Sequence, residues 1–531
     1  MNLRYFKSIL PIAALCMGSM GITSCVGDLD VTPIDPSTVM TVDPVGLFNK
    51  CYANLAMPGN GGADGDCDID RLDGGTTGFV RQMFNANVLT TDEGICSWGD
   101  EGIDAFNFNS WGATHPMLNG FYNRLYFGIT ICNHYLEVCG DYDPTMTAEI
   151  RFLRALHYYY LLDCWGNVPF ATAVSSESAP QIQRADLYTW LETELLEIKD
   201  VMSAPSVKTS SDEGYGRADQ AAAWLLLARL YLNAEVYTGT AKWAEAAQYA
   251  KMVIMDSPYH LFENGNGTYS AYQMLFMGDN GENGASCEAL LPLLQDGVTT
   301  TSYGTSLFLI AGCVQSDMGS FGTTEGWAGN RARPDLLDKF FPNRTAPNVA
   351  TADMVTAAQD DRALFYGIDR TLEVEEPTTF LSGFSVAKFS NVYSNGGTPH
   401  NSKYVDMDFF MLRVAEAYLT YAEASARANG GNVTPEGKAA IDDIRSRAHA
   451  VIRNSYTLDD ILDEWSREFY FEGRRRTDLI RYNYYGGNNN YLWQWKGGTS
   501  NGNSFSADRN IFAIPSDDMN ANSNLEQNPG Y

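Results

Sequence analysis

The strongest constraint on the fold comes from a helical pattern that occurs twice. In residues 221–234, Trp224, Leu227, Ala228 and Tyr231 recur at three- and four-residue intervals, which places them on one helix face. A turn follows, and a second alanine-rich helix is predicted over 243–255. The same arrangement is predicted in 413–424 followed by 435–451. The chain therefore contains two similar helix pairs.

This spacing of large and small residues is the tetratricopeptide pattern, in which alanines allow two helices to approach closely. A long stretch separates the copies, so they do not form a tandem array. Further helices are predicted over 43–55, 117–138, 148–164 and 186–202. The predicted fold is a mainly α single domain over 43–531. Its helical scaffold comprises about 43–59, 114–275 and 405–483.

Three loop-rich insertions interrupt or follow this scaffold, at about 60–113, 276–404 and 484–531. They are rich in Gly, Asn, Asp, Trp and Tyr, and they lack long periodic segments. Binding groups usually lie on loops that a rigid frame holds in place. The insertions are therefore where a ligand site is expected.

The N-terminus has the features of an export signal. Arg4 and Lys7 precede an apolar stretch over 9–22 that Pro11 and Gly18 interrupt, which makes it a poor membrane-spanning helix. It ends in Ile-Thr-Ser-Cys25, which resembles the lipobox of bacterial lipoproteins. The resemblance implies that a signal peptide of residues 1–24 is removed and that Cys25 is acylated. Residues 25–42 then form a polar, proline-punctuated tether. The alternative is an ordinary signal in which Cys25 is incidental.

Charge and metal-ligand spacing exclude several classes of protein. Lysine and arginine number 36 against 65 aspartates and glutamates, and the formal net charge is −29, which disfavours nucleic-acid binding. The six histidines are scattered without an HExxH motif, and no CxxC pair occurs. Apart from Cys16 in the leader and Cys25, eight cysteines remain, too few in a chain of this length for a disulfide-based scaffold.

Three stretches in order along the chain resemble one known family. Residues 151–169 contain RFLRALH and WGNVP, and 462–481 carry an E-G-x-R-x-x-D-L-x-R signature. The tail 514–531 reads IPSDDMNANSNLEQNPGY. Together they are similar to the SusD/RagB family of outer-membrane lipoproteins from glycan-utilising bacteria. Further shared stretches make the starch-binding founder of the family the most similar in appearance.

The resemblance implies a non-catalytic protein on the cell surface, lipid-anchored to the outer membrane. It would bind starch or another α-glucan as maltooligosaccharides and deliver it to a SusC-like TonB-dependent transporter. Another glycan, or a peptide, is the alternative ligand. A glycoside hydrolase is the less favoured alternative, because it needs two carboxylates at a fixed separation and no hydrolase motif is found. With 65 acids in the chain, the presence of some carboxylate pair decides nothing.

The same resemblance implies an arc of three aromatic residues at the binding site: Trp98, Tyr303 and Trp327. Flat aromatic rings stack on the C–H faces of sugar rings, and polar groups form hydrogen bonds with the hydroxyls. All three residues are flanked by Gly or polar residues rather than by an apolar run, which favours exposure. The alternative is that they only pack the loops.

Three polar residues complete the predicted site. Arg81 and Asp73 match positions near the hydrogen-bonding groups of the starch-binding relative, and could otherwise form a surface ion pair or helix cap. Glu101 departs from the family pattern, since that position is an amide in the starch binder. An ionised carboxylate only accepts hydrogen bonds, so Glu101 bears on which hydroxyls, and which glycan, are bound.

No cofactor is required by the sequence, and structural calcium stays open. The acidic run 64–73 fails as an EF-hand, because Ile69 stands where the loop needs Gly and Gly75 where it needs Glu. Residues 279–283 match an oxygen-ligand loop of the relative with one residue fewer, and no ligands are assigned there.

A separate arginine cluster, Arg467, Arg474, Arg475, Arg476 and Arg481, alternates with acids at helical spacing. That alternation predicts ion pairs that lock the scaffold rather than an anion site.

Overall fold

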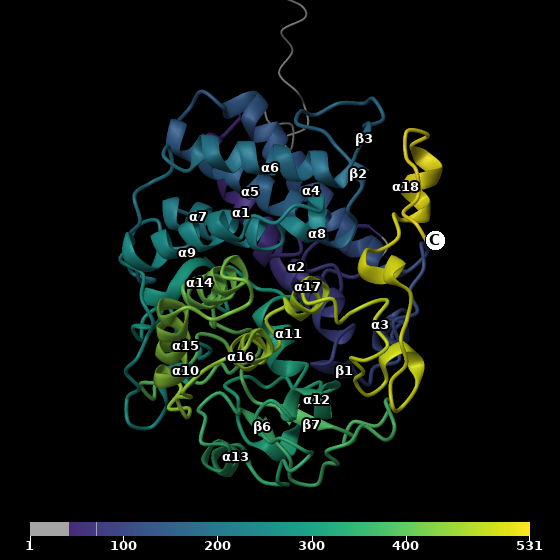
Figure 1. Ribbon diagram of the computed structural model, residues 1–531. Helices are drawn as coiled ribbons and strands as arrows, with labels where there is room; N and C mark the ends of the chain where they lie inside the picture. The colour runs from purple at the N-terminus through teal and green to yellow at the C-terminus, as the bar shows by residue number, and fades with distance from the viewer. Residues whose placement is uncertain (1–41, 71) are drawn as a thin grey trace, which may run out of the picture. The chain divides into compact units, whose positions relative to one another are not determined.

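Helices dominate the computed structural model, as the sequence predicts (Figure 1). The structure describes residues 42–70 and 72–531. The predicted leader, Cys25 and nearly all of the tether lie outside the described residues. Among residues 42–70 and 72–531, no helix is long and apolar enough to cross a lipid bilayer.

Four helices form one layer of the scaffold: α1 (Pro44–Ala56), α4 (Pro116–Cys139), α5 (Pro144–Cys164) and α6 (Arg184–Ile198). Local signals set their starts. Proline stands in the first turn of α5, and the Asp143 side chain accepts a hydrogen bond from the Met146 N–H at 2.8 Å. α4 packs against both α1 and α5, and α5 packs against α6.

The two predicted helix pairs pack together despite their separation in sequence. The first pair is α7 (Gln220–Leu232) and α9 (Trp243–Met255), joined through the short α8 (Ala234–Thr238). The second is α14 (Ala415–Ala428) and α15 (Pro435–Arg447), and α14 lies against both α9 and α7 (Figure 1). Arg229 on α7 holds Glu416 on α14 with two hydrogen bonds of 2.6 and 2.5 Å.

Several helices have boundaries that differ from those expected, most clearly in two places. Residues 409–413 form β8 (Phe409–Arg413), which pairs with β4 (Ala289–Leu293), so the second pair starts at Ala415 rather than at Arg413. The stretch 462–481 is not one helix but two, α16 (Leu458–Phe469) and α17 (Arg475–Arg481). Positive φ angles at Phe471 (63°) and Gly473 (76°) separate them, because a right-handed helix cannot continue through that region.

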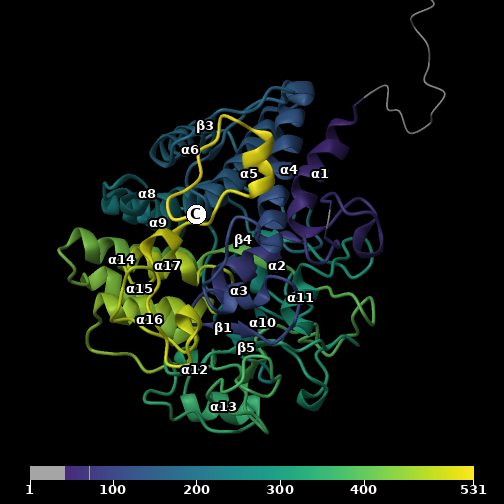
Figure 2. The same ribbon diagram turned by 90° about the vertical axis from the view of Figure 1, so that its right-hand side faces the viewer.

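The first two insertions meet in a small antiparallel sheet of order β1-β5-β7-β6. β1 (Gly94–Cys96) belongs to 60–113, whereas β5 (Asn330–Ala332), β6 (Phe365–Tyr366) and β7 (Phe384–Val386) belong to 276–404. Short helices surround it: α2 (Phe79–Phe84), α3 (Ile103–Asn107), α10 (Ala271–Met274), α11 (Ser306–Ala311), α12 (Pro334–Leu337) and α13 (Thr351–Ala358) (Figure 2). Both insertions therefore contribute strands to one sheet.

The tail returns to the first helical layer. It includes α18 (Ser516–Ala521), and the Trp165 indole on α5's C-terminal side donates to the Ala513 carbonyl at 3.0 Å. A two-stranded ribbon lies nearby, formed by β2 (Val168–Pro169) and β3 (Gln181–Ile182). Gln181 donates to the Glu526 carbonyl at 2.8 Å, which ties the tail to this ribbon.

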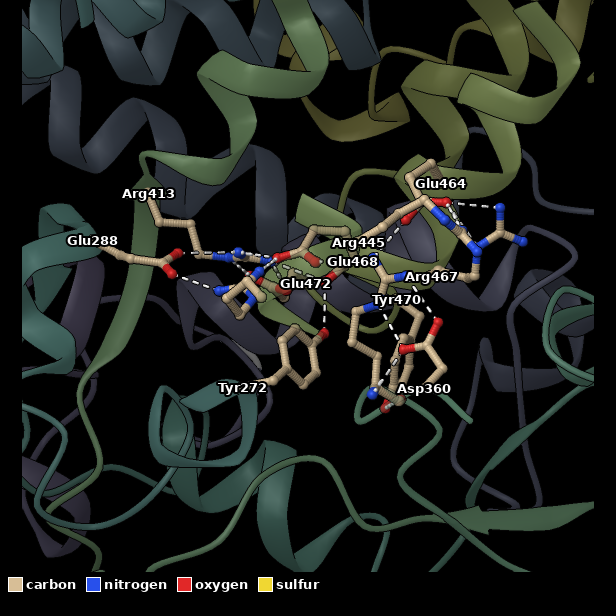
Figure 3. A network of polar contacts seen from close by, with 12 residues as sticks. Tyr272, Glu288, Asp360, Arg413, Arg445, Glu464, Arg467, Glu468, Tyr470 and Glu472 are labelled. Carbon is tan, nitrogen blue, oxygen red and sulfur yellow. Dashed lines mark hydrogen bonds and ion pairs between the residues drawn. The ribbon is translucent and has the colours of Figure 1, made fainter. Parts of the chain in front are cut away.

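A buried network of ion pairs joins the scaffold to the second insertion (Figure 3). Glu468 on α16 accepts from Arg413 at 2.6 Å and also pairs with Arg447 and Arg362. Glu464, one turn earlier, pairs with Arg362 at 2.7 Å and with Arg445 at 2.6 Å. The predicted structural role of the charges on 462–481 is confirmed, although these groups are buried rather than on an exposed face.

Lys388 extends this network into the second insertion. Its ammonium group lies 2.7 Å from Glu472 and 4.3 Å from the centre of the Tyr470 ring. Burial lowers the pKa of Lys388 to about 8, and Glu472 opposes that shift. A charged residue of the insertion is thus held between a carboxylate and aromatic faces of the scaffold.

Candidate functional site

Trp98, Tyr303 and Trp327 come from three loops and lie in one region. Trp98 follows β1, Tyr303 precedes α11, and Trp327 precedes β5. All three are half-buried and pack against the core with part of their surface. Because β1 pairs with β5, with Cys96 opposite Asn330, the loops that carry Trp98 and Trp327 leave the sheet side by side.

Trp98 lies directly on the backbone that follows Trp327. The Ser97 N–H donates to the Gly329 carbonyl at 3.0 Å. A Cβ atom at Gly329 would stand 2.2 Å from the indole nitrogen of Trp98, and its φ is +98°. Position 329 therefore requires glycine for both space and backbone conformation. The close contact fixes Trp98 relative to the Trp327 loop.

Tyr303 and Trp327 form the second contact of the group. Their ring centroids are 6.2 Å apart, and the planes are inclined by 44°. The Trp327 indole N–H donates to Glu325 at 2.7 Å. The Tyr303 hydroxyl accepts from Tyr404 at 3.1 Å and contacts the Lys403 ammonium. The polar ends of both rings are therefore engaged by the protein.

Arg81 lies beside the aromatic group. Its guanidinium carbon is 5.3 Å from the Trp98 ring and 5.2 Å from the Phe308 ring. Burial lowers the pKa of Arg81, while Asp73 and Asp100 oppose that shift. The Nε of Arg81 is buried and has no hydrogen-bond partner among the described residues. Such a donor is costly unless a water or a ligand satisfies it.

Asp73 is tied to the Tyr303 loop through the turn that precedes α2. Its carboxylate accepts from the Thr76 N–H at 2.9 Å and from the Thr76 hydroxyl at 2.7 Å. Burial alone would raise the pKa of Asp73, but these bonds and Arg81 outweigh it and lower the pKa. A Cβ at Gly75 would lie 2.7 Å from the Tyr303 Cβ, so the two segments touch.

Glu101 is exposed and has no contact with the other five residues among the described interactions. The structure thus brings together Trp98, Tyr303, Trp327, Arg81 and Asp73, and leaves Glu101 at the margin. Whether these residues bind a ligand stays a prediction.

Sequence reasoning missed two residues that hold Tyr303. The Lys403 ammonium lies 4.7 Å above the Tyr303 ring, and the Tyr404 ring packs edge-on at 5.5 Å. The Thr324 N–H donates to the Ser402 carbonyl at 2.7 Å, which links their loop to that of Trp327. Nothing in the local sequence around Lys403 indicates a partner a hundred residues earlier.

The side chains of the candidate calcium loop contact other parts of the protein. Both oxygens of Asp279 accept from Ser394, at 3.0 and 2.8 Å, and Glu282 accepts from Ser210 at 3.0 Å. Asn283 donates to the Met274 carbonyl at 3.0 Å. Within residues 42–70 and 72–531, no group of three or more His, Cys, Asp or Glu gathers to hold a metal ion. Structural calcium at this loop stays a prediction without assigned ligands.

Comparison with known proteins identifies the family of the chain. Two family models match, one described as "SusD family" over residues 319–531 and one as "Starch-binding associating with outer membrane" over 85–232. The starch-binding protein SusD of Bacteroides thetaiotaomicron is 40% identical over 569 aligned positions that cover all of both chains. The chain belongs to the SusD family. A SusD-like protein of Bacteroides ovatus is 25% identical over 69% of this chain and 66% of its own.

Solved structures agree on the SusD fold. A SusD superfamily protein from Parabacteroides distasonis superposes with a TM-score of 0.67 at 19% identity, covering 92% of this chain and 98% of its own. Surface glycan-binding protein A from Bacteroides uniformis gives a TM-score of 0.66 at 22% identity, covering 91% and 98%. At these identities the likeness concerns the fold, and it supports the mainly helical SusD-type architecture.

Proposed function

We propose that this SusD-family protein binds a starch-type α-glucan on the faces of Trp98, Tyr303 and Trp327, without cleaving it. It holds the glycan at the cell surface and delivers it to a SusC-like TonB-dependent transporter. The observation that carries the proposal is that three half-buried aromatic residues from separate loops lie in one region, with Arg81 beside Trp98. A full-length relative at 40% identity that is named a starch-binding protein supports the choice of ligand.

The arrangement suits a curved chain of neutral sugars. Inclined rings such as Tyr303 and Trp327, at 44°, can stack on successive sugar units whose own planes turn along the chain. Arg81 supplies N–H donors beside Trp98, and Asp73 supplies acceptors. Glu101 adds an exposed acceptor at the margin. A flat β-linked chain would keep its ring planes aligned and would meet these aromatic faces less well.

The family and the N-terminus support the proposed location. One matching family model is described as associating with the outer membrane. The lipobox-like ending at Cys25 supplies an anchor that holds the protein there without a spanning helix. Acyl chains on Cys25 and the tether over 25–42 would keep the glycan site beside the transporter.

Binding of a different glycan, or of a peptide, is the second candidate. Glu101 favours it, because a carboxylate there changes which hydroxyls the site can read. A glycoside hydrolase has less support, since both the relative SusD and the surface glycan-binding proteins are named for binding.

Isothermal titration of the lipid-free chain distinguishes these candidates. We expect maltoheptaose to bind at least about tenfold more tightly than cellohexaose, a difference of about 1.4 kcal/mol. Chromatography of the same incubation should detect intact maltoheptaose only. Equal affinities, or tighter cellohexaose binding, would contradict an α-glucan site, and shorter maltooligosaccharides would support the enzyme alternative.

The anchor is tested by Cys25→Ala. Without the thiol no acyl group can be attached, so the protein should appear in the soluble extracellular or periplasmic fraction, or stay unprocessed. Fractionation and immunoblotting in a strain that lacks the transporter measure this, with Cys67→Ala as the matched cysteine control. Outer-membrane recovery of Cys25→Ala equal to the parent would show that the anchor lies elsewhere.

A further inference from the structure

A second groove lies outside the aromatic site, on different elements. It has a volume of about 920 Å³ and is lined by α4, the segment 169–180 and α18. Figure 2 shows α18 beside α4, α5 and the β3 end of this segment. Asn522 donates to the Ala179 carbonyl at 2.9 Å, which fixes the α18 wall against the loop wall. Its volume falls in the range of sites that hold small-molecule ligands.

Aromatic rings form the floor of this groove. Tyr126, Phe127 and Phe170 are half-buried and line it, so part of each ring faces the open space. The rings are held in place: the Tyr126 hydroxyl donates to the Pro169 carbonyl at 2.7 Å, and Tyr158 packs on Phe170 at 5.3 Å. Fixed aromatic faces at the base of a groove are surfaces on which sugar rings can stack.

Amide groups line the α4 wall. Exposed Asn123 donates to Asn119 at 2.9 Å, and Asn119 donates to Asp517 on α18 at 3.4 Å. The Asn123 Oδ1 has no hydrogen-bond partner among the described residues, and one of its N–H groups is also left over. An amide offers both a donor and an acceptor, which is what a hydroxyl needs.

Five carboxylates and no Lys or Arg line the groove: Asp68, Asp70, Glu177, Asp517 and Asp518. Two of them are held by other side chains. Asp518 accepts from the Tyr122 hydroxyl, and Asp68 pairs with Lys50 at 2.6 Å. Burial raises the pKa of Asp518, which Tyr122 opposes, so the groove disfavours a further negative charge there. The groove offers ring faces and amides, and its carboxylates repel anions, so this combination favours a neutral polyhydroxylated ligand over an anionic one.

We propose that this groove is a second, weaker oligosaccharide-binding site. The rings of Tyr126, Phe127 and Phe170 stack on the sugar, and the Asn123 amide forms hydrogen bonds with its hydroxyls. A long glycan, or two chains, would engage the protein at two places. Because the second contact is intramolecular once the first has formed, even a weak site raises the apparent affinity for long chains. The choice of an α-glucan as its ligand rests on the proposed function.

The test is amide hydrogen exchange of residues 171–180 and α18 in the lipid-free chain, with and without 20 mM maltoheptaose. For a dissociation constant of about 10 mM, exchange of these segments should slow by about threefold. The same slowing is expected in the Trp98→Ala, Trp327→Ala variant, because the groove does not use those residues. Asn123→Arg places a long side chain in the groove from an exposed helix position. This variant should no longer show the slowing of exchange by maltoheptaose.

Gln248→Arg is the matched control, since it introduces the same charge at an exposed position on α9. It should leave the slowing unchanged. Unaltered exchange in the wild type, or slowing that survives Asn123→Arg, would overturn the second site. Slowing by hexalysine but not by maltoheptaose would assign the groove to a basic peptide instead. Failure of the aromatic site is seen separately, as retained high-affinity titration heat in the Trp98→Ala, Trp327→Ala variant.

Discussion

The Trp98→Ala, Trp327→Ala double variant is expected to lose detectable maltoheptaose binding at millimolar ligand while it keeps the wild-type fold. A buried aromatic anchor at an interface contributes on the order of 1–3 kcal/mol. Loss of two anchors therefore weakens binding by about 2–6 kcal/mol, or at least about thirtyfold. Isothermal titration measures the loss, and circular dichroism checks the fold.

The local packing indicates why the fold should survive. Trp98 and Trp327 are half-buried, and the backbone bonds around them, such as Ser97 to Gly329 and Trp327 to Ala311, do not use the indoles. Truncation therefore removes ring faces and leaves the loop connections in place. Trp243→Ala on α9 is the matched control, because this tryptophan is also half-buried but belongs to the scaffold. We expect it to bind maltoheptaose like the wild type.

Two results would decide against the aromatic site. Unchanged maltoheptaose affinity in the folded double variant would mean that the ligand binds elsewhere. An equal loss of maltoheptaose binding in Trp243→Ala would mean that binding is sensitive to general destabilisation rather than to the ring faces.

The scaffold was predictable because its helices are coded locally. Trp224 and Tyr231 recur at helix spacing, and Asp143 with Pro144 marks a helix start, so α5, α7 and α9 follow from short stretches of sequence. The break between α16 and α17 follows from tertiary contacts instead. Phe471 takes a positive φ while its ring stacks on Phe84 at 5.1 Å, and its N–H donates to Glu93 at 3.3 Å. Neither partner is near in sequence.

The candidate site, too, could be predicted only in part from local sequence. Family motifs indicated Trp98, Tyr303 and Trp327, but the residues that orient the rings are set by loop packing. Lys403 and Tyr404 reach Tyr303 only because the two insertions fold onto each other. Charge spacing likewise predicted ion pairs within 462–481, and Arg467 pairs with Glu464. It did not indicate that Glu468 meets Arg413 and Arg447 from other elements.

The largest expected effect on stability is that of Glu468→Ala, which should lower the free energy of unfolding by about 3–5 kcal/mol. Glu468 is fully buried and holds Arg413 at 2.6 Å and Arg362 at 3.2 Å. Removal of its carboxylate leaves those guanidinium groups short of a counter-charge in a place that water does not reach. Breaking one member of a buried network costs far more than loss of an exposed pair.

The dependence of the free energy of unfolding on pH follows from the same contacts. Burial alone would raise the pKa of Glu468, but Arg447, Arg413 and Arg362 outweigh it and hold the pKa well below its usual range. A depressed pKa in the folded state contributes stability above the unfolded value of about 4.3, and that contribution is lost as pH falls through the folded value. Glu468→Ala should therefore be less sensitive to acid than the wild type over that interval.

Urea unfolding at pH 7 and at pH 3, followed by tryptophan fluorescence, measures both effects through the midpoint concentration. Glu436→Ala on α15 is the control, because Glu436 is exposed and makes no ion pair among the described residues. Its midpoint should change by no more than the equivalent of about 0.5 kcal/mol. The network orders the junction between α16, β8 and the second insertion, so a Glu468→Ala midpoint equal to the wild type would mean that these arginines find other partners. In that case the buried charges would not be what holds the insertion, and with it the Tyr303 and Trp327 loops, against the scaffold.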